Sequence, residues 1–286
     1  MASPLLQTIA HISDLHFGRL DAPVAEALVA DLERDPPTLL VVSGDLTQRA
    51  RRGQFQAAAE YLKRLPTPQL VVPGNHDVPL WNLIRRIFSP MGRFRTIISR
   101  EVNPVWRNER LIVMGVNTAR SFTQMSGWIS REQIAGVQRT LTGIGPEVCK
   151  VLVTHHPFIP TPLYPEGDIL RGAARSLTEL ERCGVDVVLG GHLHVAYHDD
   201  VRAHYQGVGQ SVLSIQAGTA VSTRRRGEPN SYNRLMLAPG EVHLSVRTWD
   251  GEGFAETMIK KYRRVDDVWQ SAGDENVYRD GVARPV

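Results

Sequence analysis

The stretch "DVVLGGHLHV", residues 186–195, ends a short apolar run with two glycines and two histidines that stand two positions apart. A brief run rich in Val and Leu is typical of a strand that is buried on both faces of a sheet. Imidazole side chains are poorly suited to such a core, but they are common metal ligands. The two histidines therefore either lie exposed in a turn or bind an ion, and the rest of the sequence has to decide between these readings.

Five further apolar runs have the same character, and helical patterns lie between them. The runs are "LLQTIAHISD" (5–14), "TLLVVSGD" (38–45), "QLVVPGNHD" (69–77), "RLIVMGVN" (110–117) and "CKVLVTHH" (149–156). Apolar residues recur every three or four positions in 22–34, 54–65 and 131–144, and "SREQ" (130–133) matches a capping box at the start of the last segment. Strands that alternate with helices predict an α/β fold.

After about residue 200 strand-like pieces follow one another without helical patterns between them. "SVLSIQAG" (211–218), "YNRLMLAP" (232–239) and "EVHLSVRTW" (241–249) are linked by turns, and we expect antiparallel strands that complete a second sheet. No repeat or linker divides the chain. The sequence therefore predicts a single domain over residues 1–260 and a polar C-terminal tail over residues 261–286.

The composition is that of an ordinary globular protein, with 286 residues, 42% hydrophobic residues and a net charge of +3. No apolar run approaches the ~18 residues that a membrane span needs. The first residues lack the basic and apolar regions of a signal peptide, so we expect a cytoplasmic protein. Cys149 and Cys183 have no zinc-ligand spacing and are expected to be isolated buried thiols. Arginine clusters at 49–52, 85–100 and 224–226 indicate an anionic partner.

Polar side chains of a few types follow the predicted strands. They are Asp14 and His16 after the first strand, Asp45 after the second, Asn75, His76 and Asp77 after the third, His155 and His156 after a later strand, and His192 and His194 after the next. Because the carboxyl ends of strands in an α/β sheet meet at one edge, five loops would bring these side chains together. Asp, Asn and His without Cys suit Mn, Fe, Zn or Co. Two such ions about 3.5–4 Å apart can share a carboxylate and attract a phosphate, and Asp45 is the candidate for that shared carboxylate.

Five motifs in this order carry a resemblance to a known family. "DLH" (14–16), "GDLT" (44–47), "GNHD" (74–77), "THHP" (154–157) and "GHLH" (191–194) resemble the calcineurin-like metallophosphoesterase superfamily. The resemblance covers about two thirds of the chain. It implies a four-layer αββα sandwich, in which two mixed sheets are flanked by helices and a dinuclear metal site lies at one edge.

The resemblance also implies roles for the motif residues. One ion would be held by Asp14, His16, Asp45 and His194, and the other by Asp45, Asn75, His155 and His192. His76 would be the catalytic histidine that assists the leaving group, with Asp77 orienting it. A hydroxide held by the two ions would attack phosphorus in line. His156 would support the metal ligands or face the substrate.

The motifs indicate a phosphodiester hydrolase without identifying its ester. Within the superfamily the chain most resembles bacterial 3',5'-cyclic-nucleotide phosphodiesterases. The alternative is a UDP-2,3-diacylglucosamine pyrophosphatase, which cleaves a nucleotide-lipid at the membrane surface. A nuclease is less favoured because the charge is only mildly positive and no aromatic-basic stripe is present. A non-catalytic scaffold is less favoured because every ligand motif is intact.

Three positions outside the motifs are candidates for substrate contacts. Arg19 follows the first motif, and Arg225 and Asn230 lie in the loop "STRRRGEPNSYN" (222–233). The segment "WNLIRRIFSPMGRFRTIISR" (81–100) interleaves apolar and Arg side chains. It is either a basic amphipathic arm for peripheral contact with the inner face of the membrane, or a helix packed on the core with its Arg outside. No feature of the sequence indicates an oligomeric state.

Overall fold

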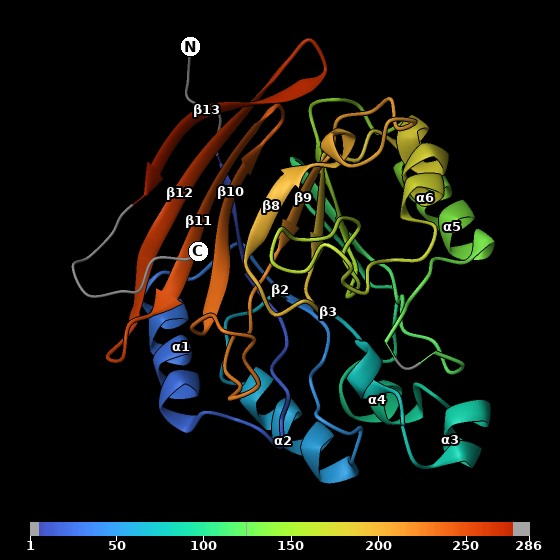
Figure 1. Ribbon diagram of the computed structural model, residues 1–286, viewed down its shortest axis with the longest axis vertical. Helices are drawn as coiled ribbons and strands as arrows, with labels where there is room; N and C mark the ends of the chain where they lie inside the picture. Colours follow the sequence, from blue (N-terminus) through green and yellow to red (C-terminus); the bar gives the residue numbers. More distant parts are fainter. Residues whose placement is uncertain (1–5, 124, 277–286) are drawn as a thin grey trace.

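Two stacked β-sheets form the centre of the computed structural model, which describes residues 6–123 and 125–276 (Figure 1). The first sheet has the strand order β13-β12-β11-β10-β1-β2-β3 and the second has the order β4-β5-β6-β7-β9-β8. The strands of the first sheet are β1 (Gln7–Ile12), β2 (Leu39–Ser43), β3 (Gln69–Val72), β10 (Ser231–Ala238), β11 (Glu241–Trp249), β12 (Phe254–Val265) and β13 (Val268–Asn276). Those of the second are β4 (Val105–Arg107), β5 (Leu111–Gly115), β6 (Cys149–Val153), β7 (Val187–Gly190), β8 (Tyr197–Asp200) and β9 (Leu213–Gln216).

Helices cover the outer face of each sheet. The helices are α1 (Ala22–Arg34) and α2 (Arg52–Leu62) on the first sheet and α5 (Arg131–Leu141) and α6 (Ala173–Leu180) on the second. α4 (Gly92–Ile97) lies beside α2, and α3 (Leu83–Phe88) stands next to α4 at the outer corner (Figure 1). Short 3-10 helices span Asn75–Asp77, Glu181–Cys183 and Val201–Ala203. One buried apolar cluster fills the space between the sheets, and another lies under each helical layer. The predicted four-layer αββα sandwich is confirmed.

The parallel strands of the two sheets point their polar loops toward one end of the molecule. β1, β2 and β3 run parallel, and so do β5, β6, β7 and β9. The expectation for the strands after residue 200 is partly wrong, because β9 is parallel to β7 and only β8 is antiparallel to it. β10 pairs with β1, where Ile9 faces Leu235, so β10 and β11 extend the first sheet instead of completing the second.

Several local signals in the sequence have the predicted outcome. At the start of α5, Ser130 Oγ accepts a hydrogen bond from the Gln133 amide at 3.3 Å, and Gln133 Oε1 accepts one from the Ser130 amide at 3.0 Å, which confirms the capping box. Cys149 and Cys183 are free and buried. Within the described residues, no helix has the length and apolar content that crossing a bilayer requires.

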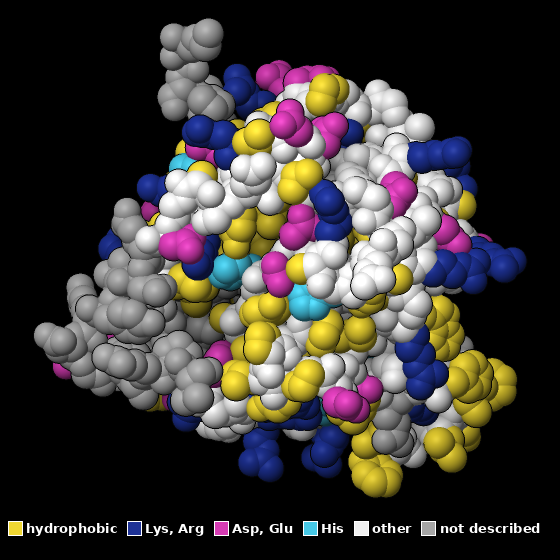
Figure 2. Space-filling model, turned by 45° about the horizontal axis from the view of Figure 1, so that its top comes forward, with side chains coloured by type: hydrophobic (Ala, Val, Ile, Leu, Met, Phe, Trp, Pro, Cys, Tyr) yellow, Lys and Arg dark blue, Asp and Glu magenta, His cyan; other side chains and the backbone are white. Residues whose placement is uncertain are grey.

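The segment 81–100 forms α3 and α4, which stand at one corner of the molecule (Figure 1). α4 buries Phe94 against the core, with Ile97 packed beside it. α3 behaves differently, because its apolar residues are exposed and Arg86 is buried. Figure 2 shows hydrophobic side chains gathered at the same corner. The packed-helix reading therefore fits α4, and membrane contact by this segment stays a prediction.

The polar tail predicted over 261–286 has to be corrected for its described part. Residues 261–276 belong to the β12–β13 hairpin at the edge of the first sheet. Its two-residue turn has φ values of 49° at Asp266 and 61° at Asp267, the pattern of a tight hairpin turn that matches strand twist. Trp269 is buried, and its indole Nε1 donates to the Asp186 carbonyl at 3.2 Å. Residues 277–286 lie outside the described residues.

Trp269→Ala should lower the free energy of unfolding by about 3–5 kcal/mol, because a large buried side chain that joins the hairpin to the second sheet is lost. Chemical denaturation followed by circular dichroism measures this change. Val265→Ala is the matched control, since Val265 lies in the same hairpin with its side chain exposed. A loss below about 1 kcal/mol for Trp269→Ala would show that residues 261–276 contribute little to the fold.

Candidate metal centre

Loops at the carboxyl ends of five strands bring the predicted ligands to one buried place. Asp14 and His16 follow β1, Asp45 follows β2, Asn75 opens the 3-10 helix after β3, His155 follows β6, and His192 and His194 follow β7. The Asp and His side chains of this group are all buried, with at most 4% of their surface exposed. Buried carboxylates and imidazoles at such density are favourable only when they are paired or coordinate a cation.

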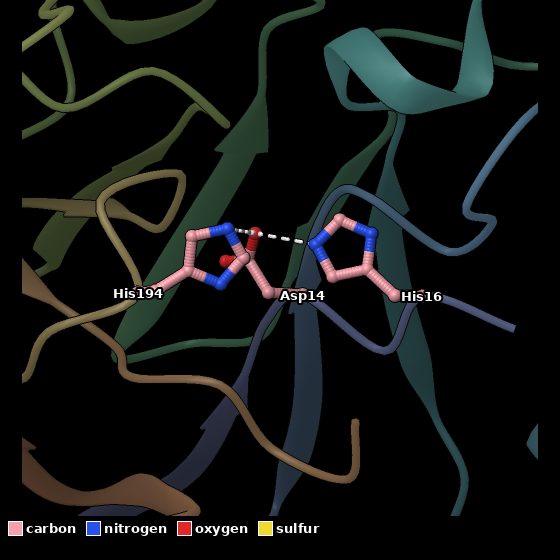
Figure 3. Close-up of side chains that lie close together, drawn as sticks. All are labelled: Asp14, His16 and His194. Atoms are coloured by element: carbon pink, nitrogen blue, oxygen red, sulfur yellow. Dashed lines mark ion pairs between the residues drawn. The ribbon is translucent and has the colours of Figure 1, made fainter. Parts of the chain in front are cut away.

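The first group of donor atoms surrounds the Asp14 carboxylate. Asp14 Oδ1 lies 3.4 Å from His16 Nε2 and 3.7 Å from His194 Nε2, and Figure 3 shows the carboxylate between the two imidazole rings. His16 Nε2 also lies 3.6 Å from Asp45 Oδ2. Asp14, His16 and His194 each offer one ligand atom within 4.8 Å of the others, which is the spacing that a single ion needs.

The second group is centred on Asn75. Asn75 Oδ1 lies 2.9 Å from His155 Nε2 and 3.0 Å from His192 Nδ1, and His155 Nε2 lies 3.4 Å from Asp45 Oδ1. Asp45 therefore directs one carboxylate oxygen to each group, Oδ2 toward His16 and Oδ1 toward His155. This is the geometry expected of a carboxylate shared by two ions.

The backbone at the site is held in an unusual conformation. Positive φ values occur at Asp14 (57°), His16 (46°), Asp45 (52°), His192 (73°) and His194 (63°). Residues other than glycine rarely adopt the left-handed region, and such strain persists only where the surrounding structure fixes it. At Gly74, a Cβ would lie 2.1 Å from Asp45 Oδ1, so only glycine lets this loop approach the carboxylate.

Hydrogen bonds to the far side of the imidazoles fix which nitrogen faces the cluster. His155 Nδ1 donates to the Ser43 carbonyl at 2.8 Å, so the Nε2 of a neutral His155 presents a lone pair. His194 Nδ1 lies 2.7 Å from Thr219 Oγ1, and the Thr219 hydroxyl donates to the Arg224 carbonyl at 3.1 Å. Both rings are thereby oriented with Nε2 toward the carboxylates.

The chemistry of this donor set fits two metal ions. Asp14 Oδ1 and His16 Nε2, which both belong to the first group, are buried without a hydrogen-bond partner. Burial opposes ionisation of Asp45, but His155 and His76 nevertheless hold the pKa of this carboxyl well below its usual range. Burial alone would lower the pKa of His155, but the Asp45 carboxylate raises it to about 9. Without a metal ion the His155 ring therefore carries a second proton. Metal binding would displace that proton.

His76 lies beside the cluster, but Asp77 does not orient it as predicted. His76 Nδ1 donates to the Gln48 carbonyl at 2.9 Å. The Asp77 carboxylate instead accepts hydrogen bonds from the amides of Leu46, Thr47 and Gly74 at 2.9–3.1 Å, because these amides line the buried space between the two loops. Asp77 thus ties the loop that carries Asp45 to the loop that carries Asn75.

Both ring nitrogens of His156 are engaged in hydrogen bonds within the protein. Its Nε2 donates to the Met125 carbonyl and its Nδ1 accepts from the Thr118 hydroxyl, both at 2.7 Å. Burial lowers the pKa of His156 to about 3, so the ring is neutral. Its centroid lies 4.7 Å from that of His192, which makes His156 a packing support for a metal ligand.

The other predicted substrate contacts are not brought into the cluster. Asn230 is fully buried, and its Nδ2 donates to the carbonyls of Thr219 and Ser222, so it holds the 222–233 loop in place. Arg19 and Arg225 are exposed at the surface. The Arg19 carbonyl accepts from the Thr223 amide, which again fixes the loop.

The residue that was missed is Arg224, whose Nη1 lies 2.7 Å from His76 Nε2. Burial alternates along this part of the loop, so that Arg224 and Arg226 are half-buried while Arg225 points outward. Because the three neighbouring residues are all arginines, the sequence does not indicate which of them points inward. The loop conformation was needed to choose between them.

A cleft opens beside the cluster and has a volume of about 180 Å³. It is lined by the polar residues Gln48, Arg49, Asn75, His76, Arg86 and Arg224 and by the apolar residues Val78, Leu80 and Met125. Asn75 belongs both to the cluster and to the lining of the cleft, and His76 lies between the two. The cleft therefore has metal-ligand side chains at one end, several arginines along its wall and an apolar side.

A family model described as calcineurin-like phosphoesterase matches residues 7–196. The chain belongs to this family. Two relatives share part of the sequence: "Glycerophosphodiester phosphodiesterase GpdQ" of Enterobacter lignolyticus is 29% identical over 171 residues, which is 53% of this chain and 57% of that protein. A probable cyclic nucleotide phosphodiesterase of Synechococcus is 31% identical over 81 residues, which is 25% of this chain and 32% of that protein. The matches thus span about half or less of the relatives' lengths.

Solved structures share the fold of this calcineurin-like chain at low sequence identity. A purple acid phosphatase from yellow lupin seeds superposes with a TM-score of 0.68 and 11% identity, covering 89% of this chain and 53% of that one. A dimetal phosphatase from Danio rerio superposes with a TM-score of 0.63 and 13% identity, covering 86% of this chain and 97% of that one. At these identities the likeness concerns the fold alone.

Gly191→Ala should reduce the metal content of this family member from about two ions per chain to about one or fewer. The added Cβ would lie 1.9 Å from Ser13 Oγ and 2.7 Å from Asp14 Oδ2, which displaces the carboxylate of the first group. Elemental analysis after manganese loading and desalting measures the content. Gly53→Ala is the matched control, because a Cβ there meets nothing within 4 Å. Full metal content in Gly191→Ala would contradict the assigned role of Asp14.

Proposed function

We propose that this chain is a dinuclear-metal phosphodiester hydrolase. The observation that carries the proposal is the Asp45 carboxylate, which places one oxygen 3.6 Å from His16 Nε2 and the other 3.4 Å from His155 Nε2. Two groups of neutral and anionic donors thereby share one carboxylate beside a cleft that Asn75 and His76 line. Mn, Fe, Zn and Co are the metals that this Asp, Asn and His donor set suits.

The side chains around the cleft suit phosphoryl chemistry. Two bound ions would supply a water of lowered pKa and positive charge for the phosphoryl oxygens. His76 sits at the border between the cluster and the cleft, with Nδ1 committed to the Gln48 carbonyl and Nε2 directed toward Arg224. An imidazole in this position can hydrogen-bond a phosphoryl oxygen or the departing oxygen.

Arg224 is the residue that we assign to phosphate binding. It is half-buried, lines the cleft, and reaches His76 with one guanidinium nitrogen. Burial lowers the pKa of the Arg224 guanidinium, and the nearby carboxylates of Asp45 and Asp14 oppose this shift. A phosphate held between the ions and Arg224 would have positive charge on two sides. This positive charge would stabilise the negative charge that develops on the phosphoryl oxygens during the reaction.

The substrate that we favour is a 3',5'-cyclic nucleotide. Val78, Leu80 and Met125 give the cleft an apolar wall on which a nucleobase can pack, and a relative from Synechococcus is named a probable cyclic nucleotide phosphodiesterase. A glycerophosphodiester is the second candidate, supported by the longer match to the Enterobacter protein. A glycerol group would leave the apolar wall without a partner, and for this reason it ranks second.

A panel of substrates tests both the reaction and its ester. Manganese-loaded protein should hydrolyse bis(p-nitrophenyl) phosphate, and kcat/KM should be higher for cyclic AMP than for glycerophosphodiesters. Asp45→Asn should lose turnover on every ester by more than about 100-fold, because the carboxylate shared by both groups loses its charge. Circular dichroism confirms that this variant is folded. If wild type and Asp45→Asn give equal rates on all esters, the proposed hydrolase is wrong.

Arg224→Ala should lower kcat/KM for phosphodiesters by about 10- to 100-fold, in line with about 1.5–3 kcal/mol for a hydrogen bond to a charged group. Steady-state kinetics under saturating manganese gives this ratio, and the metal content should be unchanged. Arg225→Ala is the matched control, because it removes the same charge from the neighbouring, outward-facing position. Equal losses in the two variants would mean that Arg224 acts only through the general charge of the loop.

A further inference from the structure

The helix α3 has its polarity reversed relative to an ordinary surface helix. A surface helix buries its apolar stripe and exposes its charges. In α3 the side chains of Leu83, Ile84, Ile87 and Phe88 are 54–82% exposed, whereas Arg86 is buried. Trp81, just before the helix, is 81% exposed. The apolar residues of this segment therefore contribute little to the core of the protein.

Arg86 holds the helix in this orientation. Its guanidinium donates to the carbonyls of Pro79, Ser121 and Thr123, so the side chain is used to attach α3 to the loop around residue 122. Phe122 lies between two of these carbonyl groups in the chain and is 83% exposed. Trp81, Leu83, Ile84, Ile87, Phe88 and Phe122 thus form one apolar protrusion, which lies at the corner where Figure 2 shows hydrophobic side chains gathered.

Positive charge surrounds the apolar protrusion. The segment 81–100 contains five arginines and no Asp or Glu. Arg93 Nη1 donates to the Ala50 carbonyl at 2.6 Å, which brings the "RARR" stretch (49–52) to the same side. Burial lowers the pKa of Arg93, and the charges of Arg85 and Arg52 lower it further. Arg49, Arg51, Arg52, Arg85, Arg95 and Arg100 are exposed.

We propose that the apolar protrusion and its surrounding arginines form a docking surface for an anionic lipid bilayer. Exposed aromatic and aliphatic side chains insert into the boundary between headgroups and acyl chains, while arginines bind acidic headgroups. An apolar area of this extent rarely stays exposed to water on a monomer without a partner. The surface is independent of the proposed hydrolase activity, because docking requires no turnover.

The shape and charge of the surface favour a bilayer over a second copy of the chain. Apart from Arg86, every residue from 81 to 89 is exposed, so α3 protrudes and a protein partner would need a socket that surrounds it. A two-fold contact through this surface would also bring two arginine clusters together, and like charges oppose such a contact. A bilayer accommodates a protrusion without a preformed socket.

Docking in this orientation would place the cleft next to the lipid surface. Arg86 both anchors α3 and lines the cleft, and Met125 of the cleft lies three residues after Phe122. A substrate that is held at or released from the bilayer would therefore enter the cleft over a short path. The same opening remains accessible to substrates in solution.

Vesicle co-sedimentation of the full chain tests the proposal. Wild type should sediment with vesicles of phosphatidylcholine and phosphatidylglycerol, sediment weakly with pure phosphatidylcholine, and be released by high salt. The combined variant Trp81→Ser, Phe88→Ser and Phe122→Ser should bind the anionic vesicles more than about tenfold more weakly. Its melting temperature and its turnover of soluble bis(p-nitrophenyl) phosphate should match wild type, since these residues touch neither the cluster nor the cleft.

A control variant and an independent measurement decide the other outcomes. Val105→Ser, Met236→Ser and Val265→Ser together remove three exposed apolar side chains elsewhere and should leave vesicle binding unchanged. Equal binding of wild type and the protrusion variant, or no binding of wild type to anionic vesicles, would overturn the proposal. Equal binding to both vesicle types would overturn its anionic part. If light scattering instead shows a wild-type dimer that the protrusion variant loses, and vesicles are not bound, the occupant is a second copy.

Discussion

The amide of His192 donates a hydrogen bond of 3.0 Å to Asp14 Oδ2, and this contact joins the carboxyl ends of two different sheets. Asp14 extends from β1 and His192 from β7, so the bond can form only when both sheets are stacked in the observed register. The inter-sheet apolar cluster supplies that stacking, because Ile9, Val41, Val153 and Leu189 pack between the layers just behind the polar loops. The cluster of metal-ligand side chains is therefore a property of the whole sandwich and not of any single motif.

The site also opposes the stability of the fold that holds it. Five of its residues lie in the left-handed region of backbone conformation, and conformations of this kind cost of order 1–3 kcal/mol each. Burial of Asp14 and Asp45 carries a desolvation penalty, but the histidines beside them more than offset it, because they hold the pKa of both carboxyls below the usual range. Asp77 satisfies three backbone amides between two ligand-bearing loops, but burial and the nearby charge of Asp45 raise the pKa of its carboxyl to about 6. Bound cations would stabilise the folded state further, since the unfolded chain does not assemble these ligands.

Short-range patterns in the sequence were sufficient for the α/β class and for the group of polar side chains that meets at one edge, whereas the four layers were implied by the resemblance to the calcineurin-like family. Val- and Leu-rich runs predicted the parallel strands, and the polar residues that end these runs predicted which side chains would meet. What the sequence could not predict depends on contacts between distant segments. The pairing of β10 with β1 and the burial of Trp269 join segments that are remote in the chain, so the polar composition of 261–276 was misleading. The partners of Asp77 and His156, and the choice of Arg224 over Arg225, depend on the direction of a side chain in a loop without a periodic pattern.

The hydroxyl of Thr219 carries a single hydrogen, and it is given to the Arg224 carbonyl. The same oxygen must then receive the hydrogen on Nδ1 of His194, which leaves the opposite nitrogen of that ring basic. The Arg224 carbonyl thus determines, through the Thr219 hydroxyl, which nitrogen of His194 carries the proton. Any rearrangement of that segment would release the hydroxyl to rotate and the ring to exchange its proton between nitrogens. Thr219 is therefore a structural connection between the His194 ring of the cluster and the loop that carries Arg224.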